Sequence, residues 1–251
     1  MPTRVQEEQR STGARPEGPQ SEQAAAAAVQ HMFDLISPRY DLLNHVLSMN
    51  VDRLWWWRTA RYFRQTLRKP AARVLDLCCG TGDMGRALRK QAGTAEIIGA
   101  DFSRGMLARG RQKFAGYNIF TIEGDALHLP FADRSFDLVV SAFGFRNLAN
   151  YDAGLHEIHR VLRIQGEIGI LDFNEPGGIL GTLYGFYFRN VLPRIGTLIS
   201  GVRGPYSYLP ASVSRFPSPS EMLGRMRAIG FCDPSWTPYT FGIAGLYRGR
   251  R

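Results

Sequence analysis

The segment VLDLCCGTGDMGRAL, residues 74–88, has the spacing GxGxxG at Gly80, Gly82 and Gly85. An acid, Asp101, follows about twenty residues later, as in dinucleotide-binding sites. Glycines in such a turn let the backbone approach a ligand closely. The spacing alone therefore predicts NAD as the ligand.

Two acids beside the turn argue against a pyrophosphate. Asp76 precedes the glycines and Asp83 follows them. In a partly buried site, each would repel a phosphate by on the order of a few kcal/mol. S-adenosylmethionine carries an ammonium and a sulfonium and no phosphate, so the acids favour it. Asp101 does not discriminate, because both ligands present a ribose diol that a carboxylate can accept.

A second loop, GDALHLPF over residues 124–131, strengthens this interpretation. Asp125 is positioned to accept from an adenine amino group, and Leu127 and Leu129 are candidates to wall the base. The alternative is an aspartate that only shapes the turn. The cofactor interpretation is preferred because the loop follows a predicted strand.

Apolar runs alternate with helical patterns along the chain, which is typical of βαβ units and a parallel sheet. Ser103 and Asp152 are expected to cap two of the helices. The end of the chain, from Pro219, predicts a helix and an antiparallel hairpin. Five parallel strands are predicted, at residues 72–78, 95–101, 118–124, 136–143 and 166–173.

The composition predicts one domain, residues 24–251, after a disordered tail over residues 1–23. The three cysteines have no metal-ligand spacing, which favours a reduced, cytoplasmic chain. In HEIHR, His159 falls one residue short of the HExxH register after His156, so no metal site is expected.

The formal net charge of +9 favours anionic partners such as nucleic acid or a membrane, or reflects composition alone. The arginines are scattered along the sequence, and no arginine-aromatic stripe stands out. We therefore expect no nucleic-acid partner.

The ordered motifs resemble the class I methyltransferases, and within them the ubiquinone/menaquinone biosynthesis C-methyltransferases. This resemblance implies a Rossmann-like, seven-stranded, mostly parallel sheet with helices on both faces and an N-terminal helical lid. The resemblance covers the chain from about Val29, and its motifs are MFDLISPRYDLLNHVLSMNVDRLWW, DLCCGTGD, GADFSRGML, GDALHLPF, SAFGFRN, RVLRIQGEIGILDF, NVLPRIG, YSYLPASVSRFP and GIAGLYRG.

The resemblance also implies methyl transfer from S-adenosylmethionine to a ring carbon of a polyprenylated hydroquinone. Demethylmenaquinol and 2-methoxy-6-polyprenyl-1,4-benzoquinol are the two candidates. Ala142 stands where some relatives have serine, and a hydroxyl contact is lost there. The expected cofactor-binding residues are Asp76, Gly80, Thr81, Gly82, Asp101, Asp125, Ala126 and Ala142.

The chemistry requires a phenolate, because an aromatic carbon is a poor nucleophile until a neighbouring hydroxyl loses its proton. Arg146 and Asn147, in FGFRN, are the predicted catalytic pair, with Arg146 stabilising the anion and Asn147 holding a water or a ring oxygen. Alternatively, Arg146 pairs with a helix carboxylate such as Glu157. Phe145 is expected to stack on a fused ring, which favours the naphthoquinol.

Two segments are expected to enclose the substrate. The first is a helical cap over residues 24–70, in which Tyr40 and Asp41 are the polar contributors, and the second is an insertion over residues 177–210. Charges interrupt the insertion too often for it to span a membrane, but it is suited to peripheral contact at the inner membrane face. Trp55 to Trp57 are expected to serve packing. A homodimer and a noncatalytic role in a quinone-synthesis complex stay open.

Overall fold

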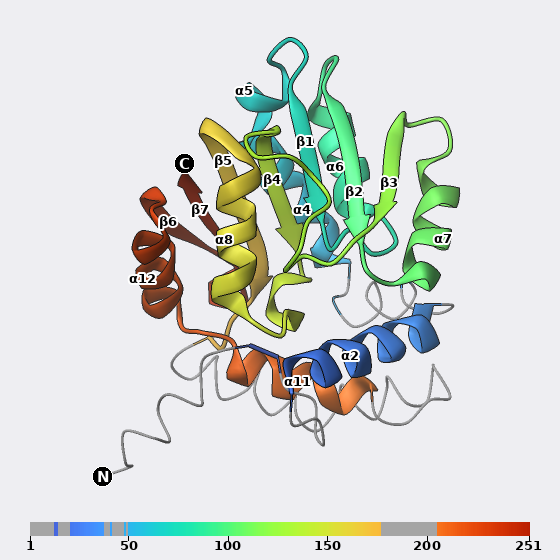
Figure 1. The fold of residues 1–251 in the computed structure, drawn as a ribbon, viewed down its shortest axis with the longest axis vertical. Helices are drawn as coiled ribbons and strands as arrows, with labels where there is room; N and C mark the ends of the chain where they lie inside the picture. The colour runs from blue at the N-terminus through green and yellow to red at the C-terminus, as the bar shows by residue number, and fades with distance from the viewer. Residues whose placement is uncertain (1–12, 15–20, 38–40, 42–47, 49, 177–204) are drawn as a thin grey trace.

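The computed structural model describes residues 13–14, 21–37, 41, 48, 50–176 and 205–251. Seven strands form one sheet in the order β3-β2-β1-β4-β5-β7-β6 (Figure 1). β1 to β5 pair in parallel, and β7 runs antiparallel to both β5 and β6. The predicted fold class is confirmed. The strands are β1 (Arg73–Leu77), β2 (Glu96–Asp101), β3 (Ile119–Glu123), β4 (Phe136–Ala142), β5 (Leu162–Phe173), β6 (Cys232–Tyr239) and β7 (Ala244–Arg250).

Helices cover both faces of the sheet. α4 packs beside α6 on one face, and α8 packs beside α12 on the other (Figure 1). Right-handed crossovers explain this division, because the chain moves one way from β1 to β3 and the other way from β4 to β5. The helices are α2 (Glu22–Ile36), α4 (Val51–Tyr62), α5 (Arg64–Leu67), α6 (Asp83–Gln91), α7 (Arg104–Phe114), α8 (Tyr151–Val161), α11 (Pro205–Arg215) and α12 (Pro219–Ile229), with 3-10 turns η2 (Phe145–Asn147) and η4 (Thr240–Gly242).

The core has two layers, one on each face of the sheet. Alternate side chains of the strands enter each layer, as the pleat requires. Val74, Leu138 and Val140 pack toward α4 and α6, whereas Leu75 and Val139 belong to the layer with α8 and α12. The sheet is therefore packed on both faces, and the site lies at the edge where its parallel strands end.

All five predicted parallel strands and the final hairpin are present. Ser103 caps α7 as predicted, since its hydroxyl accepts from the amide of Met106 at 3.1 Å. The prediction of Asp152 as a cap is wrong: Asn150 caps α8, and Asp152 lies in the first turn, 2.6 Å from Arg225. The amide oxygen of Asn150 accepts from the helix instead, which leaves Asp152 to form an ion pair.

Two predicted segments are described only in part. α4 and α5 lie within the expected cap over residues 24–70, and α2 begins two residues before it and crosses the carboxyl edge of the sheet (Figure 1). The insertion over residues 177–210 lies outside the described residues up to residue 204. In the tail over residues 1–23, Ala14 is buried and its amide donates to Leu148 O at 2.7 Å, and Ser21 caps α2. Ala14 is thus held against the domain, whereas Ser21 contacts its own helix. None of the described helices is long and apolar enough to cross a bilayer.

Candidate functional site

A cavity opens between the carboxyl ends of β1 and β4, where the chain reverses its direction across the sheet. Ligands of doubly wound sheets bind at such a point. The cavity has an empty volume of about 1010 Å³, which includes space open to solvent. Its lining contains the predicted Asp76, Gly80, Thr81, Asp101, Asp125, Ala126, Ala142 and Asn147, but neither Gly82 nor Arg146.

The glycine turn that follows β1 forms one wall. Gly80 has φ +54°, and a Cβ added there would meet nothing within 4 Å, so its backbone faces open space. Gly82 has φ +93°, but its Cβ would lie 2.4 Å from the ring of Phe114. Gly80 therefore provides the close approach to a ligand. Gly82 is required by its backbone conformation and by the packing of α7.

Asp76 is a buried acid at the end of β1. Its exposure is 0%, and neither carboxylate oxygen has a hydrogen-bond partner of normal geometry among the described residues, although the Gly85 amide is close enough to lower the pKa. Burial is the main cause that raises the pKa of Asp76 to about 8; the Gly85 amide lowers this pKa, and the nearby Asp101 and Asp83 also raise it. A cation in the cavity would supply the missing partner.

Asp101 ends β2 and ties two loops together. One carboxylate oxygen accepts from the amide of Gly80 at 2.8 Å and the other from the amide of Ser103 at 2.9 Å. Burial raises the pKa of Asp101 to about 6, although these amides lower it. Each carboxylate oxygen keeps a second lone pair, so the group can still accept from a ribose diol.

A cluster of polar side chains links the glycine turn to Asp41, which precedes the sheet in the sequence. Lys113 Nζ lies 2.8 Å from Asp41, 2.9 Å from Asp83 and 3.1 Å from the Thr81 hydroxyl. The same hydroxyl donates to Asp41 at 2.5 Å. Asp41 therefore joins the cap to the glycine turn, as its sequence position suggested, whereas Tyr40 lies outside the described residues. Lys113 was not predicted, because nothing in its local sequence marks it.

α2 is fastened over the cavity at a second point. Asp34 accepts from the Ser103 hydroxyl at 2.5 Å and from the Gly105 amide at 3.1 Å, and Gln30 donates to Phe102 O at 2.6 Å. Phe33, on the same helix, lines the cavity. The helix that was expected to act as a lid therefore covers the site through specific polar contacts.

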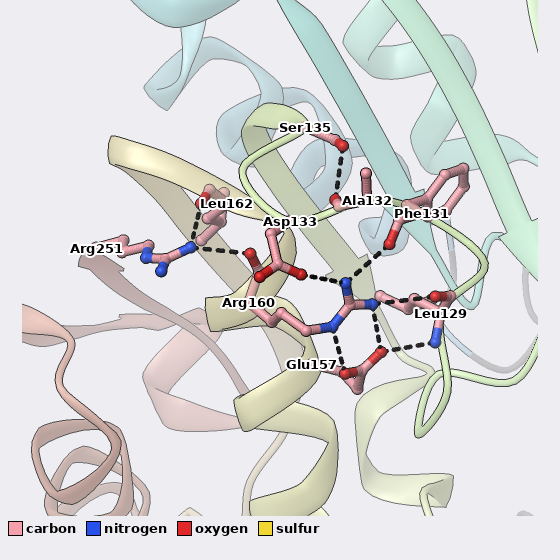
Figure 2. A network of polar contacts seen from close by, with 9 residues as sticks. All are labelled: Leu129, Phe131, Ala132, Asp133, Ser135, Glu157, Arg160, Leu162 and Arg251. Carbon is pink, nitrogen blue, oxygen red and sulfur yellow. Dashed lines mark hydrogen bonds and ion pairs between the residues drawn. The ribbon is translucent and has the colours of Figure 1, made fainter.

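Figure 2 shows how the loop after β3 is held against α8. Arg160 binds Glu157 at 2.7 Å and Asp133 at 2.8 Å, and it donates to the carbonyls of Leu129 and Phe131. The amide of Leu129 donates to Glu157 as well, at 2.7 Å. This network fixes the loop that presents Asp125, Ala126 and Leu127 to the cavity. Leu129 packs in the core and does not line it.

Asp125 is the most open of the predicted cofactor residues, with a side-chain exposure of 52%. One carboxylate oxygen accepts from the Leu127 amide at 2.9 Å, and the other faces His128 at 3.3 Å. The contact with Leu127 is the turn-shaping role that the sequence left open. The other lone pairs leave room for a ligand amino group.

The two residues of the predicted catalytic pair differ in position. Asn147 is 8% exposed and lines the cavity, and its side-chain oxygen has no hydrogen-bond partner among the described residues. Arg146 is buried, does not line the cavity and binds Asp172 at 2.9 Å. The alternative partner, Glu157, is held by Arg160 instead.

The aromatic wall differs from the prediction. Phe145 has 0% exposure and packs against Tyr151 and Phe216 in the core, so it cannot stack on a substrate ring. Trp56, expected to serve packing alone, lines the cavity together with Phe33, Phe102 and Phe143. The sequence did not show which aromatic rings face the cavity, because the direction of each side chain depends on how its helix or turn packs.

Comparisons with known proteins identify the family of this chain. Residues 20–251 match the model of the ubiE/COQ5 methyltransferase family. A demethylmenaquinone methyltransferase from Deinococcus radiodurans is 49% identical, with 88% of this chain and 92% of that protein covered. The one from Thermus thermophilus is 45% identical, with 88% and 100% covered. A ubiquinone/menaquinone biosynthesis C-methyltransferase from Geobacter sulfurreducens is 42% identical, with 89% and 88% covered.

Solved structures share the fold. A SAM-dependent methyltransferase from Thermotoga maritima, described as a possible histamine N-methyltransferase, superposes with a TM-score of 0.63 at 18% identity, with 88% of this chain and 99% of that chain covered. The [4+2]-cyclase SpnF superposes with a TM-score of 0.66 at 16% identity, with 95% and 98% covered. Since the names of these two proteins describe different reactions, the fold alone does not indicate which reaction this chain catalyses.

Proposed function

Because the chain belongs to the ubiE/COQ5 methyltransferase family, we propose that it transfers a methyl group from S-adenosylmethionine to a ring carbon of demethylmenaquinol. The observation that carries the proposal is the buried carboxyl of Asp76 in a cavity that also holds Asp101 and Asp83. Such a site suits a cationic, phosphate-free cofactor. The naphthoquinol is favoured because the two relatives above with the highest identity are named demethylmenaquinone methyltransferases.

The residues fit the cofactor. Asp101 would accept from the ribose hydroxyls, Asp125 from the adenine amino group, and Asp76 would balance the positive charge beside the open backbone of Gly80. Thr81, Ala126 and Ala142 would form the remaining contacts. When bound, S-adenosylmethionine supplies an electrophilic methyl group.

The acceptor would lie beside Asn147. Its amide would hold a ring oxygen or an ordered water as the hydroxyl loses its proton, and the low exposure strengthens such a bond. Trp56, Phe33 and Phe143 would wall the ring and exclude water. Arg146 acts through its neighbours, because its guanidinium binds Asp172 and the Phe143 carbonyl and thereby shapes the turn that presents Asn147. Acceleration would come from orientation and from stabilisation of the phenolate.

The test is methyl transfer from labelled cofactor, with reduced demethylmenaquinone and the methoxy-benzoquinol offered in parallel in detergent. We expect label in the naphthoquinol. Asn147→Ala should lower kcat on the order of a hundredfold with unchanged cofactor affinity, as for loss of one preorganised donor. Gln112→Ala, which removes an exposed amide on α7, is the control.

The other outcomes discriminate between the alternatives. Label in the benzoquinol would select ubiquinone biosynthesis, a reading that the name of the Geobacter sulfurreducens relative also covers. Cofactor binding without label in either quinol would overturn the acceptor. A protein that binds no cofactor would be the noncatalytic subunit that the sequence left open.

A further inference from the structure

Three consecutive tryptophans of α4 point in three directions. Trp55 is buried, and its Nε1 donates to the Thr240 hydroxyl at 2.8 Å. Trp56 lines the cofactor cavity, and Trp57 is 45% exposed. Adjacent residues of α4, Trp56 and Trp57, thus contribute to the wall of the cavity and to the outer surface of the protein.

A groove runs along this outer surface, between α4 and the edge of the sheet. On the opposite face, α12 covers β6 and β7. The groove has an empty volume of about 740 Å³, which includes space open to solvent, and none of its lining residues is acidic. The lining residues are Trp57, Arg58, Arg61, Tyr62, Thr237, Tyr239 and Leu246.

Arginines and aromatic rings alternate in the groove. Arg58 lies 4.4 Å from the ring centre of Tyr239, and Arg61 lies 5.2 Å from that of Trp57. Arg248, on β7, lies 4.0 Å from the ring centre of Tyr62. These cation-π contacts fix the guanidinium groups without neutralising them. The groove therefore combines positive charge with a rigid aromatic floor.

The exposed side of α4 and α5 extends this charge. Leu54, Trp57 and Tyr62 are exposed between the cations. Asp52, the acid within residues 51–69, is buried. The exposed cations of these residues are Arg53, Arg58, Arg61, Arg64, Arg68 and Lys69.

We propose that this surface, the α4 face, docks on a bilayer of anionic phospholipid. Arginines attract the phosphates, and tryptophan and tyrosine favour the boundary between headgroups and acyl chains. Leu54 supplies an apolar group that can enter it. The inference rests on the proposed function in one respect: a lipid quinol is dissolved in such a bilayer, and Trp56 places the cavity next to the docked face.

The same surface argues against nucleic acid as the partner. Stacking platforms for single strands need open aromatic faces. Here guanidinium groups lie over Trp57, Tyr62 and Tyr239. Exposed aliphatic side chains such as Leu54 also have no role on a phosphate backbone. The fold brings together arginines that are scattered in the sequence, and the resulting surface suits a lipid bilayer better than a nucleic acid.

The test is co-sedimentation of the full chain with vesicles, in the absence of cofactor and quinol. Vesicles of phosphatidylcholine alone are compared with vesicles that contain one part phosphatidylglycerol in four. We expect binding to the anionic vesicles only, weakened by added salt. Arg58→Gln with Arg61→Gln should weaken binding on the order of 10- to 30-fold, given the known contribution of each arginine near a charged bilayer.

A matched control is Arg111→Gln with Arg227→Gln, which removes the same charge from exposed sites on α7 and α12. It should bind like the parent protein. Arg53→Gln with Arg64→Gln is a second test pair, because both side chains are exposed and lie outside the groove lining. The inference is overturned if both test pairs bind like the parent, or if the parent binds a single-stranded RNA and no vesicles. Methyl transfer to a quinol with a short, soluble side chain separates this failure from that of the proposed function.

Discussion

Asp172 holds Arg146 at two points: one carboxylate oxygen lies 2.9 Å from Nη1, and the other accepts from the backbone amide of Arg146 at 3.0 Å. Asp172 is fully buried, at 0% exposure. The guanidinium also donates to the carbonyl of Phe143, and Tyr151 donates to the carbonyl of Arg146. The pair therefore fixes the turn that places Asn147 at the cavity.

We predict that Arg146→Ala lowers the free energy of unfolding by about 3–5 kcal/mol, because it leaves the Asp172 carboxylate buried without its cation. Urea denaturation measures this loss. A paired replacement, Arg146→Met with Asp172→Leu, should recover much of the stability but little turnover, because Asn147 is still misplaced. Full stability with lost turnover in Arg146→Ala would instead support direct action of Arg146 on the acceptor.

Cofactor binding should release protons through Asp76. Burial raises the pKa of Asp76 to about 8, and a bound cation favours the ionised form. Affinity should therefore rise with pH up to about 8, and calorimetry in buffers of different ionisation enthalpy should show proton release below that pH. Asp76→Asn should release fewer protons; an unchanged number would move the effect to Asp101, whose pKa is raised to about 6.

The same group affects stability without the cofactor. The folded Asp76 keeps its proton up to about pH 8, whereas an unfolded aspartic acid loses its proton at about pH 4. The folded state binds more protons in between, so Asp76 makes stability fall as the pH rises through this window. Asp76→Asn should flatten this part of the stability profile, even if the variant binds no cofactor. An equally steep profile would contradict the assignment.

Lys113→Gln should loosen the cap. The substitution leaves Asp41 and Asp83 near each other without the cation that joins them. The three side chains are 19–30% exposed, so each ion pair contributes about 1 kcal/mol after screening. We expect roughly tenfold weaker cofactor binding, mostly through faster dissociation, measured by stopped flow. Lys90→Gln, at an exposed site on α6, should leave the dissociation rate of the cofactor unchanged. Equal dissociation rates in the two variants would rule out a role of the Lys113 ion pairs in retaining the cofactor.

Arg160→Gln should free the loop after β3. The change removes contacts to Glu157, Asp133 and two loop carbonyls (Figure 2). A loss of ~2 kcal/mol should lower the melting temperature by about 4–8 °C in a domain of this size. Cofactor affinity should fall while kcat at saturation is kept. A kcat that falls with unchanged affinity would show that the loop affects the acceptor instead.

Local sequence patterns were sufficient for the secondary structure and for much of the cavity. Apolar runs and turn residues predicted the strands, and the acids beside Gly80 favoured the cofactor class that the family comparison supports. These features depend on residues that are close in sequence. Asp76, Gly80 and Asp101 meet because parallel strands end at one edge of the sheet.

Tertiary packing decided the features that the sequence left open. Phe145 and Trp56 exchanged their expected places, because the direction of a side chain depends on the helix or turn as it packs. Arg146 forms an ion pair with Asp172 on β5, and Arg160 forms the ion pair with Glu157. Each partner was one of several acids available in the sequence, and only the crossing of chain segments selects among them.

The α4 face shows the same limit most clearly. Its arginines come from residues 51–69, and Tyr239 and Arg248 come from the final hairpin. In the sequence they are separated by most of the chain, so no local pattern joins them. The sequence by itself determined the charge, the sheet and the glycine turn with the acids beside it. The tertiary structure decided which charges are buried in pairs and which remain on the surface, because that depends on contacts between distant segments.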